Sequence, residues 1–168
     1  TFPAYDSAII VTSFAKNLSL PGERIGYICV NPACPDKADV VAACIFCTRI
    51  LGYVNAPALF QRVVSETWNA KADYSLYEKR RNELMAILDE AGIAYAKPEG
   101  AFYLFCKAPD SFKGDDMAFC DYLKKYFILC APGSGFGGKG WFRIAYCVSE
   151  QSILNSKGAF IKAMKDLK

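Results

Sequence analysis

The chain has 168 residues, of which 53% are hydrophobic and 22% are charged, as is typical of a globular protein with a hydrophobic core. Twenty Lys and Arg residues against seventeen Asp and Glu leave a net charge of +3, which is too balanced to indicate binding to nucleic acid or to an anionic membrane. The most apolar stretch, "ADVVAACIFC" at 38–47, is too short to span a bilayer, and the N-terminus does not resemble a secretory signal. We therefore expect no nucleic acid and no membrane among the partners.

The first half of the chain predicts two strands and two helices. A continuous β-branched run at 8–12 is typical of a strand that is buried on both faces, and a second strand is expected at 24–30. Apolar spacing predicts a helix over 36–51. Pro57 is suited to open a further helix through 58–69, because the missing N–H of proline is not needed in the first turn.

The second half begins with the strongest helical pattern of the sequence, at 74–91, which Gly92 ends in the usual C-terminal manner. Asp115 and Ser149 precede two further helical patterns and are suited to cap them. The remaining predicted elements are helices at 117–127 and 150–167 and strands at 101–106, 128–132 and 141–148. Because strands and helices interleave, the sequence predicts an α/β or α+β fold.

Eight cysteines are many for this length, whereas histidine is absent. Disulfide frameworks are typical of small secreted domains without a sufficient core, and this chain has the apolar residues for a core. The only close pair, Cys44 and Cys47, has no second pair at the spacing of a zinc finger. The sequence therefore predicts reduced, mostly buried thiols, a cytoplasmic location and no metal.

The glycine-rich stretch "PGSGFGGKG" at 132–140 matches G-x-G-x-x-G twice, starting at Gly133 and at Gly135. A dinucleotide site needs a helix after such a loop, so that the pyrophosphate lies at the helix N-terminus. Here a predicted strand follows instead. We therefore reject a dinucleotide site and expect a flexible loop near a ligand.

Arg143 is the unusual residue of the last predicted strand. Alternation along the strand places it on the same face as Trp141 and Ala145. An arginine among aromatic neighbours is usually edge-exposed or paired with a carboxylate of the protein. Alternatively, its planar fork binds the carboxylate of a ligand, and composition leaves both possibilities open.

The loop in "SFAKNLSLPGERIGYI" at 13–28 holds two cations, Lys16 and Arg24. If the flanking strands are neighbours, both cations converge on one small pocket. Repulsion between neighbouring cations favours the neutral lysine amine, which attacks aldehydes to form a Schiff base. Ser13 adds a hydroxyl group that is suited to meet a phosphate. The alternative is an ordinary solvated turn.

Three blocks of the sequence together resemble one family. The stretches "SFAKNLSLPGERIGYI" at 13–28, "PEGAFYLF" at 98–105 and "PGSGFG…WFRIAYCVSE" at 132–150 are similar, in order and spacing, to blocks of pyridoxal-phosphate-dependent aminotransferases of the aspartate aminotransferase fold family. The resemblance covers nearly the whole chain. It implies an α/β fold of type I in which residues 1–73, with the lysine loop at 13–24, end the large cofactor-binding domain. Residues 74–168 would then form the interdomain helix and the small C-terminal domain.

The resemblance also implies roles for four residues. Lys16 matches the lysine that holds pyridoxal 5'-phosphate as a Schiff base and shuttles a proton at the substrate α-carbon. Ser13 and Arg24 match residues that bind the cofactor phosphate, and Arg143 matches the arginine that binds the substrate α-carboxylate. The implied activity is transfer of an amino group from an amino acid to a 2-oxo acid by a homodimer. A carbon–sulfur lyase or another pyridoxal phosphate reaction on the same fold remains an alternative, as does a non-catalytic truncated module.

Two departures from the family pattern stand out. Ala15 occupies a position where the family often has a second serine, so we expect one phosphate contact to be lost. The family enzymes are more than twice as long, and the resemblance identifies this chain with their C-terminal portion. The strands around Lys16 would then lack sheet neighbours and expose an edge.

Overall fold

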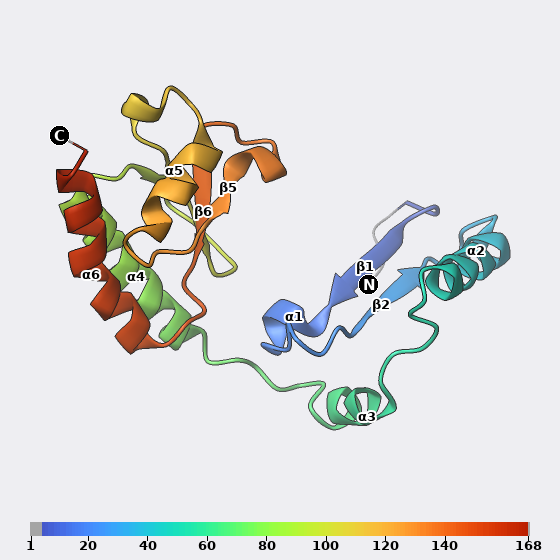
Figure 1. Ribbon diagram of the computed structural model, residues 1–168. Coiled ribbons are helices and arrows are strands. Elements are labelled where there is room, and N and C mark those ends of the chain that lie inside the picture. The colour runs from blue at the N-terminus through green and yellow to red at the C-terminus, as the bar shows by residue number, and fades with distance from the viewer. Residues whose placement is uncertain (1–4, 168) are drawn as a thin grey trace. The chain divides into compact units, whose positions relative to one another are not determined.

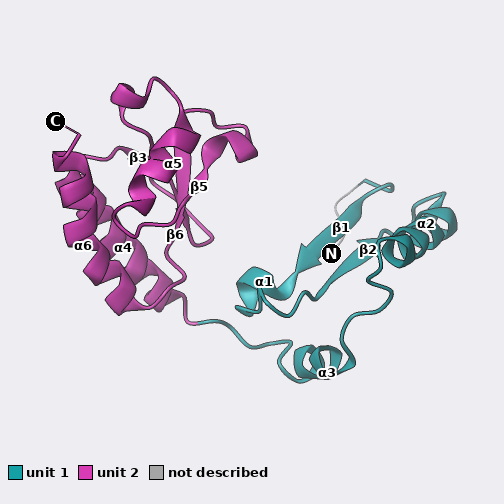
Figure 2. Ribbon diagram, in the orientation of Figure 1, with its two compact units in different colours: residues 1–72 teal, residues 73–168 magenta. Residues whose placement is uncertain are grey.

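The computed structural model describes residues 5–167 and divides into two compact units, residues 1–72 and 73–168 (Figure 2). The helices are α1 (Phe14–Asn17), α2 (Lys37–Ile50), α3 (Ala58–Glu66), α4 (Tyr74–Ala91), α5 (Asp116–Lys124) and α6 (Glu150–Lys165). The strands are β1 (Ile9–Ser13), β2 (Gly26–Val30), β3 (Tyr95–Ala96), β4 (Tyr103–Lys107), β5 (Ala131–Pro132) and β6 (Trp141–Ala145), with short 3-10 turns η1 (Asp110–Phe112) and η2 (Gly133–Phe136). Helices and strands interleave along the chain, as the sequence predicts.

Unit 1 is built on an antiparallel pair of strands, β1 and β2, which are joined by the lysine loop (Figure 1). The register pairs Ile9 with Val30 at one end and Ser13 with Gly26 at the other. Among the described residues of this unit, the hydrophobic cluster is small and has three buried members, Phe14, Ile25 and Val64. This cluster is formed by residues of the segment that joins the two strands and of α3, not by the side chains of the two strands.

The expectation that β1 is buried on both faces is wrong for the described residues. Ile9 and Val11 keep 47% and 72% of their surface exposed. Helix α2 likewise buries none of its residues, and Phe46 on it is 63% exposed. A continuous apolar run indicates a strand covered on both faces only when neighbours exist to cover it. In residues 5–167 the sheet of β1 has two strands.

Unit 2 holds a four-stranded antiparallel sheet in the order β3-β4-β6-β5. Helices α4 and α6 pack side by side, and α5 contributes Phe119 to the same core (Figure 1). Alternation along the two central strands buries one face of the sheet and leaves the other half-buried. The fully buried residues of this core include Leu88, Leu104, Cys106, Phe119, Leu123, Phe142 and Phe160.

The predicted helix ends of unit 2 are confirmed by their hydrogen bonds. Asp115 accepts a hydrogen bond from the backbone N–H of Ala118 at 2.9 Å, and Ser149 accepts one from that of Ser152 at 3.1 Å. Gly92 ends α4 with a φ of +73°, the left-handed conformation that glycine adopts without strain. An N-cap of this kind stabilises a helix by about 1 kcal/mol.

All eight cysteines, which lie within the described residues, are free thiols, as predicted. The expectation that most of them are buried is wrong, because only three, Cys34, Cys106 and Cys120, are buried, whereas three are intermediate and two are exposed. Cys106 is fully buried in the core, and burial raises the pKa of its thiol to about 12. Within residues 5–167, no helix combines the length and the apolar character needed to cross a membrane.

The predicted helix at 117–127 ends early, and Phe127 explains where. Its φ is +60°, a conformation that a bulky side chain adopts only with strain, and 97% of its surface is exposed. We expect Phe127→Asn to raise the free energy of unfolding by about 1 kcal/mol, because asparagine tolerates this conformation and little burial is lost. Thermal unfolding followed by circular dichroism measures the change.

Leu129→Asn is the matched control, because Leu129 is also highly exposed, at 80%, and has no positive φ. This variant should unfold at the temperature of the unmodified chain. A melting temperature of Phe127→Asn at or below that of the Leu129 variant would contradict the strain at Phe127.

Candidate functional site

The lysine loop folds back on itself around one buried aromatic residue. Strand β1 ends at Ser13, and α1 follows directly as a single helical turn. The backbone N–H of Phe14 donates to the carbonyl of Ile25 at 3.1 Å, and that of Leu20 donates to the carbonyl of Phe14, also at 3.1 Å. Both ends of the loop are thus tied to Phe14, and Lys16 lies exposed on the same turn.

An aromatic cluster anchors this turn. The ring centre of Phe14 lies 5.8 Å from that of Tyr27 on β2 and 6.3 Å from that of Trp68 after α3. Tyr27 and Trp68 also contact each other at 6.3 Å. Because Phe14 is two positions before Lys16 in a helical turn, burying the phenylalanine leaves the lysine on the outer side.

Ser13 and Arg24 meet at a common cavity of about 240 Å³, which Lys16 does not line. Gly26 faces Ser13 across the ladder, and a Cβ atom there would collide with the carbonyl of Thr12 and lie 3.0 Å from the Cα of Ser13. Arg24 has a φ of +53°, and its Nη1 donates to the carbonyl of Pro21 at 3.0 Å. Glycine at position 26 therefore allows the two strands to approach each other closely at this end of the ladder.

The donors of this loop fit a small ligand that carries both a phosphate and an aldehyde. A hydroxyl group and a guanidinium suit phosphate oxygens, and a lysine amine suits an aldehyde. Ala15 also lines the cavity and presents a methyl group where a serine would add a donor. The residue types at Ser13, Lys16 and Arg24 therefore suit the phosphate and the aldehyde of pyridoxal phosphate, but the expected convergence of Lys16 and Arg24 on one pocket is not seen, because Lys16 does not line the cavity.

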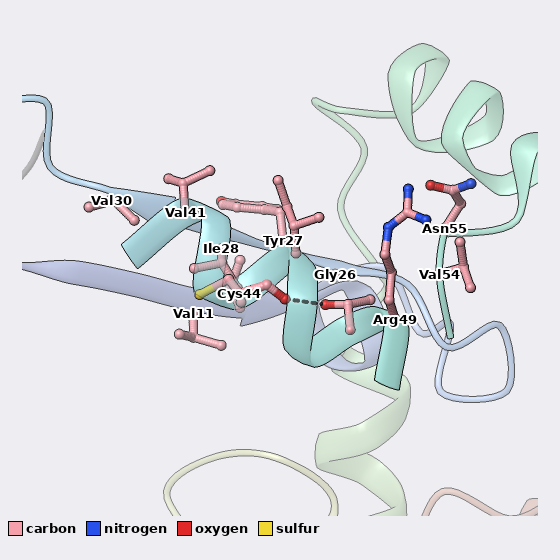
Figure 3. A pocket seen from close by; sticks show the side chains of 13 residues that line it. Val11, Gly26, Tyr27, Ile28, Val30, Val41, Cys44, Arg49, Val54 and Asn55 are labelled. Atoms are coloured by element: carbon pink, nitrogen blue, oxygen red, sulfur yellow. Dashed lines mark hydrogen bonds between the residues drawn. The ribbon is translucent and has the colours of Figure 1, made fainter. Parts of the chain in front are cut away.

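A second cavity of unit 1, of about 580 Å³, lies between the β1–β2 pair and α2 (Figure 3). Its walls are mainly apolar side chains of both strands and of the helix, including Val11, Ile28 and Val41. Arg49 and Asn55 bring polar groups to one end of it (Figure 3). The cavity offers apolar surface rather than an arrangement of reactive groups.

Arg143 lies in unit 2, on β6, and its guanidinium contacts two aromatic rings. Its guanidinium carbon is 4.3 Å from the ring centre of Tyr103 on β4 and 4.1 Å from that of Phe136. On the same half-buried face, Trp141 stacks on Phe105 with ring centres 5.6 Å apart. No carboxylate within residues 5–167 forms an ion pair with Arg143. Its charged fork is therefore oriented by rings and suited to a carboxylate from outside the described chain.

The glycine-rich loop at 133–140 is pinned, contrary to the expectation of a flexible loop. Asp116 on α5 keeps only 3% of its surface exposed. Its Oδ2 accepts the backbone N–H of Ser134 at 2.8 Å, and its Oδ1 accepts that of Gly140 at 3.1 Å. These bonds, chiefly the one from Ser134, lower the pKa of Asp116 to about 2. Strand β6 follows the loop, as predicted, so no helix N-terminus is present for a pyrophosphate.

The two hydrogen bonds that Asp116 accepts predict that the stability of unit 2 falls in acid. In the unfolded chain this carboxyl group takes up a proton near pH 4, whereas in the folded chain it stays ionised down to about pH 2. Between these values the unfolded state binds more protons, so stability falls as the pH falls. Asp116→Asn lacks this contribution. We expect the urea midpoints of the two proteins to differ at pH 5 and to converge by about pH 2, and parallel curves would contradict the assignment.

Three residues of this region were not singled out in the sequence analysis: Tyr103, Asp116 and Phe136. Tyr103 and Phe136 come from separate elements, and only the folded sheet brings both rings to Arg143. The "DD" pair at 115–116 is the signal in the sequence for Asp116, but the capping pattern explains only Asp115. In the part of the chain that the structure describes, no group of three or more acidic or cysteine side chains is arranged to hold a metal ion.

Comparisons with known proteins give the same family as the sequence blocks. The family profile "Aminotransferase class I and II" matches residues 2–155. The LL-diaminopimelate aminotransferase of Nitratidesulfovibrio vulgaris is 37% identical over 163 residues, which covers 89% of this chain and 39% of that enzyme. The probable aspartate/prephenate aminotransferase of Aquifex aeolicus is 30% identical over 171 residues, covering 94% and 41%.

A crystal structure of an aminotransferase from Eubacterium rectale is 42% identical and superposes with a TM-score of 0.81 over 96% of this chain and 40% of that one. The chain thus spans about two fifths of the length of the relatives it matches. Enzymes of the matched family use pyridoxal phosphate. With a profile match over most of its residues and a shared type I fold, the chain belongs to the aminotransferase class I and II family.

Proposed function

We propose that this chain is the C-terminal portion of a pyridoxal-phosphate-dependent aminotransferase that moves an amino group between an amino acid and a 2-oxo acid. The observation that carries the proposal is the lysine loop. Lys16 lies on a single helical turn, α1, which directly follows Ser13, and Ser13 and Arg24 from the two ends of the lysine loop line one cavity. Membership of the family supports the class of reaction, and the lysine loop contains the residues that we assign to it.

In this proposal Ser13 and Arg24 bind the phosphate of the cofactor through a hydroxyl group and a guanidinium. Lys16 holds the cofactor covalently through its amine. When bound, pyridoxal phosphate supplies an electron sink for the charge that develops on the substrate α-carbon. The amine of Lys16, once freed, would take the proton from that carbon and deliver it to the C4′ carbon of the cofactor, which is the proton transfer that amino transfer needs.

Arg143 binds the α-carboxylate of the substrate in a bidentate fork. Fixing the carboxylate fixes the direction of the bonds at the α-carbon and thereby selects the bond that breaks. The two rings at 4.3 Å and 4.1 Å support this role, because they orient the guanidinium without using its donors in an ion pair. Arg143 recognises a group that all amino acids share, so side-chain specificity lies elsewhere.

We further propose that residues 1–73 end the large cofactor-binding domain and that residues 74–168 form the interdomain helix and the small domain. The division of the structure after Ala72 supports this boundary. We also propose that the whole enzyme is a cytoplasmic homodimer. The free thiols support a reducing compartment, and the dimer rests on the resemblance to the family.

Borohydride reduction of the chain after incubation with pyridoxal phosphate tests the proposal. A single stoichiometric adduct on Lys16, mapped by mass spectrometry, is the expected result. A substoichiometric label spread over many lysines would contradict a cofactor site formed by this chain. In the whole protein, amino transfer that depends on a 2-oxo acid is expected, and thiol release without such transfer would contradict the assignment as an aminotransferase.

A further inference from the structure

The two hydrogen bonds that Asp116 accepts come from opposite ends of the glycine-rich loop. Ser134 lies near its start and Gly140 at its end, so one buried carboxylate closes the whole segment. A buried carboxylate must have its lone pairs satisfied, and charge-assisted bonds of this kind are stronger than neutral ones. Helix α5 therefore determines where the loop lies.

Within the loop, further bonds fix the position of Phe136. The N–H of Gly138 donates to the carbonyl of Gly133 at 2.9 Å, and that of Trp141 donates to the carbonyl of Gly138 at 3.1 Å. Gly137, directly after Phe136, turns the chain with a φ of +77°. The segment is a closed turn that carries one large side chain.

Core packing does not explain that side chain. Phe136 is 54% exposed, and its ring lies against the guanidinium of Arg143 at 4.1 Å. Tyr103, the second ring that contacts the guanidinium, belongs to the central strand β4 and is placed by the sheet. Of the two rings that hold Arg143, only Phe136 depends on the loop for its position.

We propose that Asp116 is a positioning residue for Arg143. By closing the loop it places the ring of Phe136 on the guanidinium, and it thereby limits the long arginine side chain to one orientation. An arginine otherwise has many rotamers, and fixing it before a ligand arrives lowers the entropy lost on binding. The expected effect of Asp116 on the affinity for a carboxylate ligand rests on the proposed function of Arg143. The expected effect of Asp116 on the orientation of the Arg143 side chain does not.

The side-chain Nε–Hε resonance of Arg143 in the ¹⁵N-labelled chain tests the placement, because ring currents from Tyr103 and Phe136 shift it upfield. Arg143→Lys assigns the signal, and Phe136→Leu measures the share of the shift that this ring causes. We expect Asp116→Asn to lose the same share. Asp115→Asn is the matched control, since asparagine is also a good N-cap and Asp115 bonds Ala118 rather than the loop.

If Asp116→Asn keeps the full upfield shift while its backbone spectrum remains folded, the proposal is wrong. If Asp116→Asn unfolds, the same resonance is followed in the unmodified chain as the temperature is raised. The Arg143 shift should then decline together with the amide signals of Ser134 and Gly140 and before that of Phe142 in the core. A decline that follows only the core amide would also overturn the proposal.

Titration with acetate, observed at the same resonance, separates this inference from the proposed function. We expect acetate to move the Arg143 signal and to bind Asp116→Asn about three- to tenfold more weakly. No response to acetate in the unmodified chain would refute the carboxylate site, while the ring-current comparison would still decide the role of Asp116. Equal acetate affinity of the two proteins would overturn the effect of Asp116 on binding.

Discussion

Replacing Lys16 by alanine is expected to abolish both the borohydride adduct and amino transfer by the whole protein. The amine is the covalent attachment point of the cofactor in the proposal and also the group that moves the proton. General acid–base catalysis alone contributes about 10²–10⁴-fold, so the rate should fall by at least about 10³-fold. Steady-state assay of keto-acid formation, together with mass spectrometry of the reduced adduct, measures both losses.

The loss should be chemical rather than structural. Lys16 is exposed on a single helical turn, and alanine is a good helix former, so unfolding should change by no more than about 0.5 kcal/mol. Lys71→Ala is a suitable control, because Lys71 is another exposed lysine of unit 1 and lies outside the lysine loop. Normal turnover in the Lys16 variant would refute the assignment.

Gly133→Ala should strongly destabilise the glycine-rich loop at 133–140. A Cβ atom at this buried position would collide with the carbonyl oxygen of Gly138 and lie 2.6 Å from that of Trp141. Both obstacles are backbone atoms of the closed turn, so neither can rotate away. We expect a loss of about 3 kcal/mol, at the upper end for overpacking, and a melting temperature lower by more than about 10 °C.

Gly135→Ala is the matched control two residues later in the same loop. A Cβ atom there meets nothing within 4 Å, and its φ is not in the left-handed region. This variant should melt at or slightly above the temperature of the unmodified chain, since alanine lowers the entropy of the unfolded state. Equal melting temperatures for the two variants would contradict this prediction, because they would mean that the backbone around Gly133 shifts to accommodate a Cβ atom at little cost.

Sequence reasoning succeeded where the signal is local. The bounds of α4 follow from apolar spacing and from Gly92, and Asp115 and Ser149 act as the caps that were expected. The family assignment also came from local blocks, and the comparisons confirm it. The roles of Ser13, Lys16, Arg24 and Arg143 stay predictions until they are tested.

What the sequence could not show depends on distant neighbours. The two-residue strand β3 was not anticipated, because it exists only through pairing with β4. The exposure of β1 could not be read from its apolar run, because covering neighbours are a property of the fold. For the same reason the ring of Phe136 on Arg143 and the bonds to Asp116 escaped a reading of spacing alone.

The unequal cores of the two units have a consequence for how the protein is degraded. Among the described residues, the hydrophobic cluster of unit 2 has eighteen buried members, whereas that of unit 1 has three. Local opening is governed by how much apolar contact a segment must lose, so the lysine loop should exchange its amides and meet proteases far more often than the sheet that carries Arg143. A cell that clears this chain would begin at the half that carries the lysine and leave a resistant remnant near residues 73–168.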